Sequence, residues 1–323
     1  MQQEIRFATF NTLNLAPPGA RLYDNLDIAT PEQVEAKLDW TARQLDLMDA
    51  DVIGFQEIFS QATLQAVLAR TRLYRDAFHV GFDANAPGER LTPGVALVSR
   101  LPLREAGVEF KLFPPEVLLP DGSRDPDRFA RAPVHAAVML GPERAIDVVV
   151  VHLKSKRPDY RNGDAGDDPL LFAQACLRSL LRRGTEAVAL RVLLHKLAQA
   201  HGRPQVVLGD FNDVADSVTT GIVLGTGCPV GERLFDAYQI QRQQDHLRHI
   251  GFSSLHEGQY TTIDHVLVSG HFNRLLPEAI GEVVDVIYLN DHLALGRPEA
   301  SDHGQVIARL RLFEAGGADA GRG

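Results

Sequence analysis

Short apolar runs rich in β-branched residues alternate with longer segments of helical periodicity along most of the chain. Apolar runs of about four to eight residues are typical of strands buried in a sheet, and strands that alternate with helices indicate an α/β fold. The predicted strands are residues 5–10, 51–56, 94–99, 135–140, 146–152, 205–209, 263–269 and 305–312. Periodicity alone does not separate one α/β fold from another.

Three segments between these runs are predicted to be helical. Thr30 precedes Pro31 and Gln33, which is the pattern of an N-cap with a proline at the first helical position and a capping-box residue. Ser60 is predicted to cap a second helix. Residues 170–200 have a strong helical pattern, which Gly184 is predicted to split because glycine weakens a helix interior.

The composition is that of an ordinary globular protein, since 45% of the 323 residues are hydrophobic and 23% are charged. The formal net charge of −9 argues against a basic protein that coats nucleic acid. It does not exclude an enzyme that acts on polyanions, because a bound divalent metal reverses the local field. Cys176 and Cys228 lack metal-binding spacing and are interpreted as buried thiols.

No signal-peptide pattern and no apolar run of about 20 residues is visible in the sequence. A soluble cytoplasmic protein is therefore the expectation.

Polar residues recur at the ends of the predicted strands. Carboxylate and amide oxygens suit a hard cation such as Mg²⁺, and histidines beside carboxylates suit proton transfer. The sequence contains none of the patterns GxSxG, GxxxxGK[ST], GxGxxG and HExxH. These observations favour attack of metal-activated water on a phosphoester. The strand-end residues are Asn11, Glu57, His152, Asp210, Asn212, Asp264, His265, Asp302 and His303.

The segments that carry these residues resemble the endonuclease/exonuclease/phosphatase superfamily, which includes the deoxyribonuclease I-like nucleases. In the order that the superfamily has, they are ATFNTLNL, DVIGFQEI, VVVVHLKSK, VVLGDFND, TTIDHVLVS and SDHGQVIARL, and they span residues 5–312. The resemblance implies a four-layer α/β sandwich in which two mixed β-sheets pack face to face with helices outside. We expect one such domain over residues 1–314 and a flexible tail over 315–323.

The resemblance also implies a metal site for Mg²⁺ or Mn²⁺. Glu57 matches the principal metal-binding carboxylate, and Asn11 matches the strand-end asparagine beside the metal. Asp302 is the candidate for an additional metal ligand.

Five further residues match catalytic positions of the superfamily. His152 is expected to hydrogen-bond the scissile phosphate, Asp210 to position or activate water, and Asn212 to hold a phosphate oxygen. Asp264 is expected to orient His303, which acts as a base or as a phosphate contact.

Several weaker signals surround these motifs. Arg131, Lys154 and Lys156 are candidates for binding substrate phosphates, with surface ion pairs or solvated lysines as the alternatives. Asn14 either shapes the site or lies in a surface loop, and His265 is interpreted as structural. Helical spacing of His246 and His249 is better explained by a solvated helix face than by a metal site. Two loops, 112–133 and 157–169, are either solvated surface or the lining of a substrate cleft.

The substrate class stays open at this point, because one fold supports many phosphoesterases. FNTLNL, HLKSK and the Asp/Gly loop resemble bacterial nucleases of the superfamily most, so a nuclease is favoured. A small-molecule or lipid phosphodiesterase or phosphatase is the first alternative, and a non-catalytic binding module is the second. No stripe of basic and aromatic residues of the kind that binds single strands is present.

Overall fold

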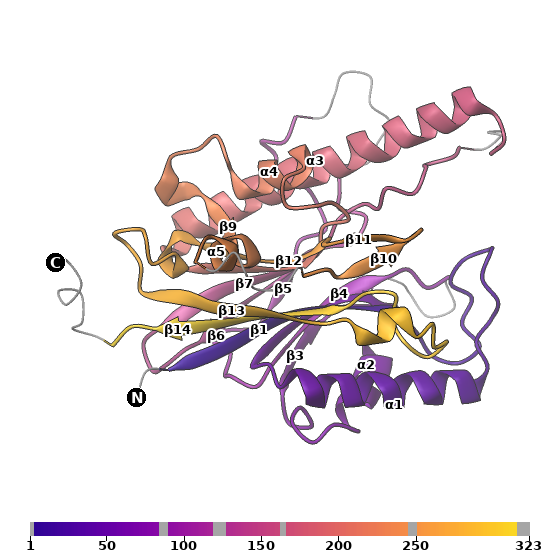
Figure 1. Ribbon diagram of the computed structural model, residues 1–323, viewed down its shortest axis with the longest axis horizontal. Coiled ribbons are helices and arrows are strands. Elements are labelled where there is room, and N and C mark those ends of the chain that lie inside the picture. Colours follow the sequence, from indigo (N-terminus) through magenta and orange to yellow (C-terminus); the bar gives the residue numbers. More distant parts are fainter. Residues whose placement is uncertain (1–2, 84–89, 119–126, 162–165, 245–250, 315–323) are drawn as a thin grey trace.

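Two six-stranded mixed β-sheets pack face to face at the centre of the protein, and helices cover their outer faces (Figure 1). The computed structural model describes residues 3–83, 90–118, 127–161, 166–244 and 251–314. The sandwich that the resemblance implied is thereby confirmed.

The first sheet has the strand order β13-β14-β1-β2-β4-β3. Its only parallel pair among the described strands is β1 with β2. Helices α1 and α2 lie on its outer face (Figure 1). The bounds are β1 Glu4–Leu15, β2 Val52–Ile58, β3 Phe78–Gly81, β4 Gly94–Ser99, β13 Gly281–Leu289, β14 Gln305–Leu312, α1 Pro31–Met48 and α2 Gln61–Leu68.

The second sheet has the strand order β5-β6-β7-β8-β12-β9, with β7 and β8 parallel. Helices α3 and α4 lie on its outer face (Figure 1). The bounds are β5 Val108–Glu109, β6 Val134–Met139, β7 Ala145–His152, β8 Gln205–Asp210, β9 Leu234–Asp236, β12 Asp264–Ser269, α3 Pro169–His201, α4 Val218–Leu224 and α5 Ala237–Gln244. A separate hairpin pairs β10 Ser254–His256 with β11 Gln259–Thr261, and short 3-10 helices cover Val230–Glu232, Gly270–Phe272 and Asp291–Ala294.

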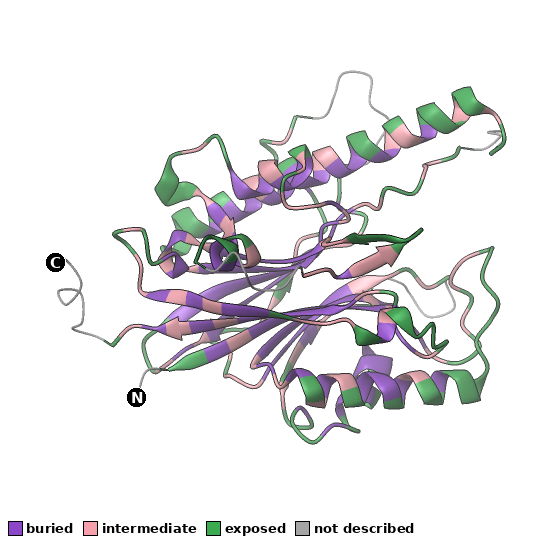
Figure 2. Ribbon diagram, in the orientation of Figure 1, coloured by how far each residue is buried: buried purple, intermediate pink, exposed green. Residues whose placement is uncertain are grey.

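The apolar core has three parts that correspond to the spaces between the layers. One lies between the sheets and includes Phe7, Val150 and Leu208, and the others lie between each sheet and its helices. Figure 2 shows the central strands buried along most of their length. The sheets are therefore held rigidly, which fixes the side chains at their edges.

The sequence predictions of local structure are mostly confirmed. All eight predicted strands form, and Thr30 and Gln33 make the reciprocal capping-box hydrogen bonds of 3.3 and 2.9 Å. The strands β3, β5, β9, β10, β11 and β13 and the helices α4 and α5 were not predicted. Cys176 and Cys228 are free, and each is half-buried rather than buried.

The predicted split at Gly184 is wrong, because α3 runs without interruption from Pro169 to His201. A Cβ atom added at Gly184 would meet no atom within 4 Å apart from the neighbouring backbone of α3 itself. Packing of the buried face of α3 against the sheet outweighs the weak helix propensity of a single glycine.

Gly184→Ala is expected to stabilise the protein by about 0.5–1 kcal/mol, because alanine restricts the unfolded chain and fits the helix. Gly202→Ala is the contrasting control, since Gly202 caps α3 with a φ of +60°. That change is expected to cost about 1 kcal/mol. Urea denaturation measures the free energy of unfolding of both variants. A change in the same direction for the two would contradict this account.

Candidate active site

Strand register places three site residues in one row across the second sheet. His152 at the end of β7 lies opposite Asp210 at the end of β8, and Asp210 lies opposite Asp264 at the start of β12. All three side chains are buried. His152 Nε2 lies 3.4 Å from Asp210 Oδ2. The row therefore places a histidine and two carboxylates side by side, shielded from solvent.

The first sheet adds residues to the same place. Asn11 of β1 donates from Nδ2 to Asp210 Oδ2 at 3.1 Å, although the two are far apart in sequence. His303, just before β14, donates from Nδ1 to Asp264 Oδ2 at 2.8 Å. Its Nε2 then faces Asp210 Oδ2 at 3.9 Å. Five of the residues predicted from sequence thus meet at one end of the two packed sheets.

The ionisable side chains in this row shift one another's pKa values. Burial and the neighbouring Asp264 charge raise the pKa of Asp210 to about 7. Burial lowers the pKa of His303, but the Asp264 and Asp210 charges outweigh it and leave that pKa well above its ordinary value. Burial, together with the Arg131 and His303 charges, holds the pKa of His152 well below its ordinary value. The site therefore pairs a neutral His152 with a protonated His303.

Left-handed backbone conformations position two further predicted residues. Glu57 has a φ of +60° at a bulge where the β2–β4 register shifts between Gln56 and Ile58. Bulges re-aim side chains, and such a conformation in a glutamate is retained only where the surroundings enforce it. Asn212 has a φ of +52°. Its N–H donates to Asp210 Oδ1 at 2.7 Å and its Nδ2 donates to the Leu153 carbonyl at 3.0 Å.

The oxygen-rich side of the site fits a hard divalent cation. Glu57 Oε2 accepts a hydrogen bond of 2.9 Å from the backbone N–H of Asn14. The side-chain oxygens Asn14 Oδ1 and Asp264 Oδ1 are buried without a hydrogen-bond partner among the described residues. Buried oxygens without a protein partner are suited to accept from a cation or a water molecule. Asp302 is exposed, with Oδ1 3.9 Å from His303 Nε2.

Asp210, Asp264 and His303 form a second group that could hold a metal ion, since one potential ligand atom of each lies within 4.8 Å of the others.

The three basic residues predicted to bind substrate have partners within the protein. Lys156 Nζ forms an ion pair of 2.9 Å with Asp213 Oδ1. Lys154 Nζ donates to the carbonyls of Ser155 and Arg157. Arg131 donates to the Leu153 carbonyl at 3.5 Å, and its Nε is buried without a partner in the part of the chain that the structure describes.

His265 is not available for chemistry. Its Nδ1 lies 2.7 Å from Asp236 Oδ2 and its Nε2 lies 2.9 Å from the Asp213 carbonyl. Two acceptors require both ring nitrogens to donate, so the ring is cationic and buried. Residues His246 and His249 lie outside the described residues, as does the 315–323 tail.

Glu186 of α3 is a site-shaping residue that the sequence analysis missed. Its buried carboxylate accepts a hydrogen bond of 3.0 Å from the N–H of Ala130 and one of 2.8 Å from the N–H of Lys154. Ala130 precedes Arg131, and Lys154 follows the segment that carries His152. One side chain therefore joins the two loops next to the row of catalytic candidates. Its i−4 ion pair with Arg182 is an ordinary helix pattern. No local motif signals the link between the loops, because the two N–H groups are more than 30 residues away.

Glu186→Gln is expected to loosen both loops, because an amide presents only one acceptor and turns its NH₂ toward the second N–H. Loss of a hydrogen bond to a charged group costs about 1.5–3 kcal/mol. Hydrogen exchange is expected to rise in peptides covering Ala130 and Lys154. Glu116→Gln is the matched control, since Glu116 pairs with Lys196 on the surface. Unchanged exchange in both peptides would show that Glu186 does not hold the loops.

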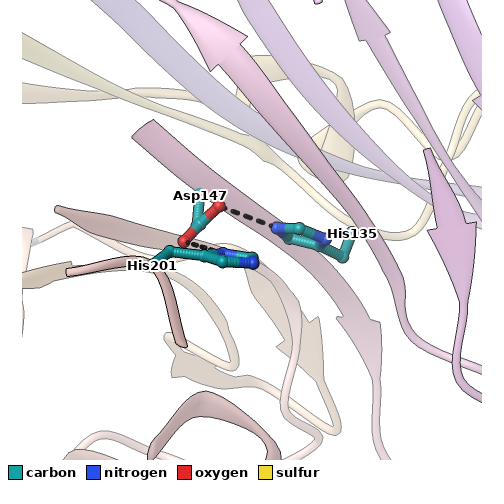
Figure 3. A group of neighbouring side chains, drawn as sticks. All are labelled: His135, Asp147 and His201. Atoms are coloured by element: carbon teal, nitrogen blue, oxygen red, sulfur yellow. Dashed lines mark hydrogen bonds and ion pairs between the residues drawn. The ribbon is translucent and has the colours of Figure 1, made fainter. Parts of the chain in front are cut away.

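A second cluster lies at the other end of the same sheet (Figure 3). Asp147 Oδ1 is 2.9 Å from His135 Nε2, and Asp147 Oδ2 is 2.9 Å from His201 Nδ1. Arg203 donates to Asp147 Oδ1 at 3.1 Å. Although these histidines and the aspartate could hold a metal ion, the carboxylate already has three donors and a cationic partner. We interpret the cluster as a structural connection between β7 and the end of α3.

The fold and the row of histidines and carboxylates at the sheet edge define a class of protein, the hydrolases of phosphoester bonds. The chain belongs to the endonuclease/exonuclease/phosphatase family, whose model matches residues 8–303.

Solved structures with low sequence identity share the fold. The human Nocturnin catalytic domain with bound sulfate has 16% identity and a TM-score of 0.61, over 97% of this chain and 98% of that one. A family protein from Bacteroides vulgatus has 17% identity and a TM-score of 0.57, over 96% and 100%. Humanized D. rerio TDP2 has 15% identity and a TM-score of 0.58, over 95% and 98%. A search of curated protein sequences finds no match. Within the described residues, no helix has the length and apolar character needed to cross a membrane.

Proposed function

We propose that this protein is a divalent-metal-dependent phosphodiester hydrolase and that nucleic acid is its preferred substrate. The observation that carries the proposal is the position of Asp210, with the Nε2 atoms of His152 and His303 at 3.4 and 3.9 Å from its Oδ2. A phosphate bound in front of these groups meets two imidazoles and a carboxylate that can take a proton.

Each side chain in the row has a distinct role in this proposal. Asp210 accepts the proton of the attacking water, because a pKa near the working pH favours proton transfer. His303, held in one orientation by Asp264, donates to a phosphate oxygen and stabilises its charge. His152 and the amide of Asn212 bind the remaining phosphate oxygens.

The residues that would hold Mg²⁺ or Mn²⁺ are Glu57, Asn11 and Asp302. Hard carboxylate and amide oxygens suit these ions, and the orphaned Asn14 oxygen beside Glu57 supports a cation there. A cation bound at this side supplies positive charge to the phosphate.

The preference for nucleic acid is supported by basic groups next to the row. Arg131 donates to the carbonyl of Leu153, the residue after His152. Lys154 lies two residues after His152, and its Nζ donates to the Arg157 carbonyl. The second candidate, hydrolysis of a small phosphoester, is favoured by the internal partners of Lys154 and Lys156 and by the net charge of −9.

A substrate panel separates the two candidates. Activity is expected on DNA or RNA and on bis-p-nitrophenyl phosphate, is expected to vanish in EDTA, and is expected to be much weaker on p-nitrophenyl phosphate. Nucleic-acid affinity should fall with salt at a log–log slope of about −0.9 per phosphate contact on duplex. The Lys154→Ala/Lys156→Ala variant should flatten that slope, whereas Lys196→Ala, at another ion pair, should not. Faster turnover of the monoester than of any diester would refute the nuclease assignment.

A further inference from the structure

A cavity of about 340 Å³ lies between the segment after β1 and the first turns of α1. Large apolar side chains are exposed at its edge, since Leu26 is 43% and Ile28 is 54% exposed. This volume lies at the lower end of the range of about 300–1,000 Å³ for ligand pockets. It suits one organic group of nucleoside size. The apolar lining consists mainly of Ala16, Pro17, Leu22, Leu26, Ile28 and Val34.

Two polar residues connect this cavity to the metal side of the active site. Asn14 lines the cavity, and its N–H donates to Glu57 Oε2 at 2.9 Å. Its side-chain oxygen is buried without a partner in the described part of the chain. A group in the cavity would therefore lie directly beside the residue that we assign to the cation.

Lys37 of α1 also lines the cavity and makes no side-chain hydrogen bond or ion pair with the described residues. Burial lowers the pKa of Lys37 to about 8, although the charges of Asp302, Glu57 and Glu299 oppose this shift. The side chain is half-buried and lies between the cavity and the acidic side of the site. Its ammonium can donate to an acceptor that a ligand in the cavity provides.

We propose that this cavity binds the nucleoside group that is esterified to the scissile phosphate, with the base between the apolar side chains and its acceptors toward Lys37. The inference rests on the proposed function and narrows it to nucleotide diesters. A hydrocarbon chain would fill the apolar part equally well but would leave the ammonium of Lys37 without an acceptor. A nucleobase satisfies both features, because it has flat apolar faces and a polar edge.

The test compares nucleoside esters with a small ester. The substrates are the p-nitrophenyl esters of thymidine and adenosine 5′-phosphate, and methyl p-nitrophenyl phosphate. Wild-type protein is expected to prefer a nucleoside ester in kcat/KM. Ala36→Trp, which fills the cavity, and Lys37→Met, which removes the donor, are each expected to lower that preference by about tenfold or more. The controls Ala62→Trp on α2 and Lys196→Met on α3 should retain it.

A binding measurement keeps the two proposals distinguishable. By calorimetry, wild-type protein is expected to bind thymidine or adenosine 5′-monophosphate more tightly than inorganic phosphate, and Lys37→Met should reduce the difference. If the methyl ester is hydrolysed but neither nucleoside is preferred, the cavity proposal is wrong while the phosphodiesterase stands. If no ester is hydrolysed but nucleotide binding still depends on Lys37, the proposed function fails and the cavity remains a nucleotide site. Nucleotide binding that is equal in both proteins overturns the cavity proposal.

Discussion

Replacing Asp210 with asparagine is expected to lower kcat by about 10²–10⁴-fold, the usual contribution of a positioned acid–base group. The amide keeps the shape of the side chain and can still accept from the Asn212 N–H, which lies 2.7 Å from Asp210 Oδ1. It cannot accept a proton from water. Steady-state kinetics on bis-p-nitrophenyl phosphate measures the loss, and thermal unfolding shows whether the fold is retained.

The matched control is Asp39→Asn, an acid-to-amide change at an exposed ion pair with Arg70 on the outer face of α1. Turnover of this variant should equal that of the wild type. Near-wild-type kcat in Asp210→Asn would remove Asp210 from the catalytic set.

His303 and Asp264 are expected to act as one unit. His303→Ala should lower kcat by a similar factor of about 10²–10⁴. Asp264→Asn should act by releasing the His303 ring, so the double variant should lose little more than His303→Ala alone. Additive losses would mean that Asp264 acts independently of the histidine.

Much of the fold could be predicted from sequence, because buried strands have short continuous apolar runs. The strand β13 could not, since its polar residues are explained only by cross-strand partners. Asp285 of β13 lies 2.7 Å from Arg309 of β14, and neither residue alone indicates the pair. The continuity of α3 through Gly184 likewise depends on packing that propensity does not include.

The candidate site was predictable in its residue types but not in its geometry. Polar residues at strand ends indicated a shared edge, and strand register then brought His152 and Asp210 opposite each other. The bulge that turns Glu57, and the ion pair that holds Lys156 against Asp213, depend on contacts between distant segments. The role of Glu186 depends on two loops that close over one carboxylate. Sequence spacing carries no information about such contacts.

Removal of the Asp147 carboxylate is expected to have the largest effect on stability. Asp147 is fully buried and accepts from His135 of β6 and from His201 at the end of α3 (Figure 3). It also accepts from Arg203, in the segment after α3. Breaking a buried, hydrogen-bonded ion pair by removing one partner costs about 3–5 kcal/mol. Asp147→Ala should lower the free energy of unfolding by that amount. Asp39→Ala, which breaks an exposed pair with Arg70, should change it by about 0–1 kcal/mol.

The pKa of the same carboxylate determines how its contribution to stability depends on pH. Burial raises the pKa of Asp147, but the hydrogen bonds and charges of His135 and His201 outweigh burial and hold that pKa below its ordinary value. A carboxyl with a lowered pKa in the folded state stabilises the protein above its unfolded pKa of about 3.9, and this contribution is lost as the pH falls further. The difference in free energy of unfolding between wild type and Asp147→Ala, measured by urea denaturation, should therefore be at its full size at pH 7. It should become progressively smaller below about pH 4. Because Asp147 lies five residues before His152 on β7, about 16 Å along the strand, kcat of the folded variant should stay near that of wild type. A constant stability difference down to the lowest pH would mean that packing, and not the charge of Asp147, holds α3 to the sheet.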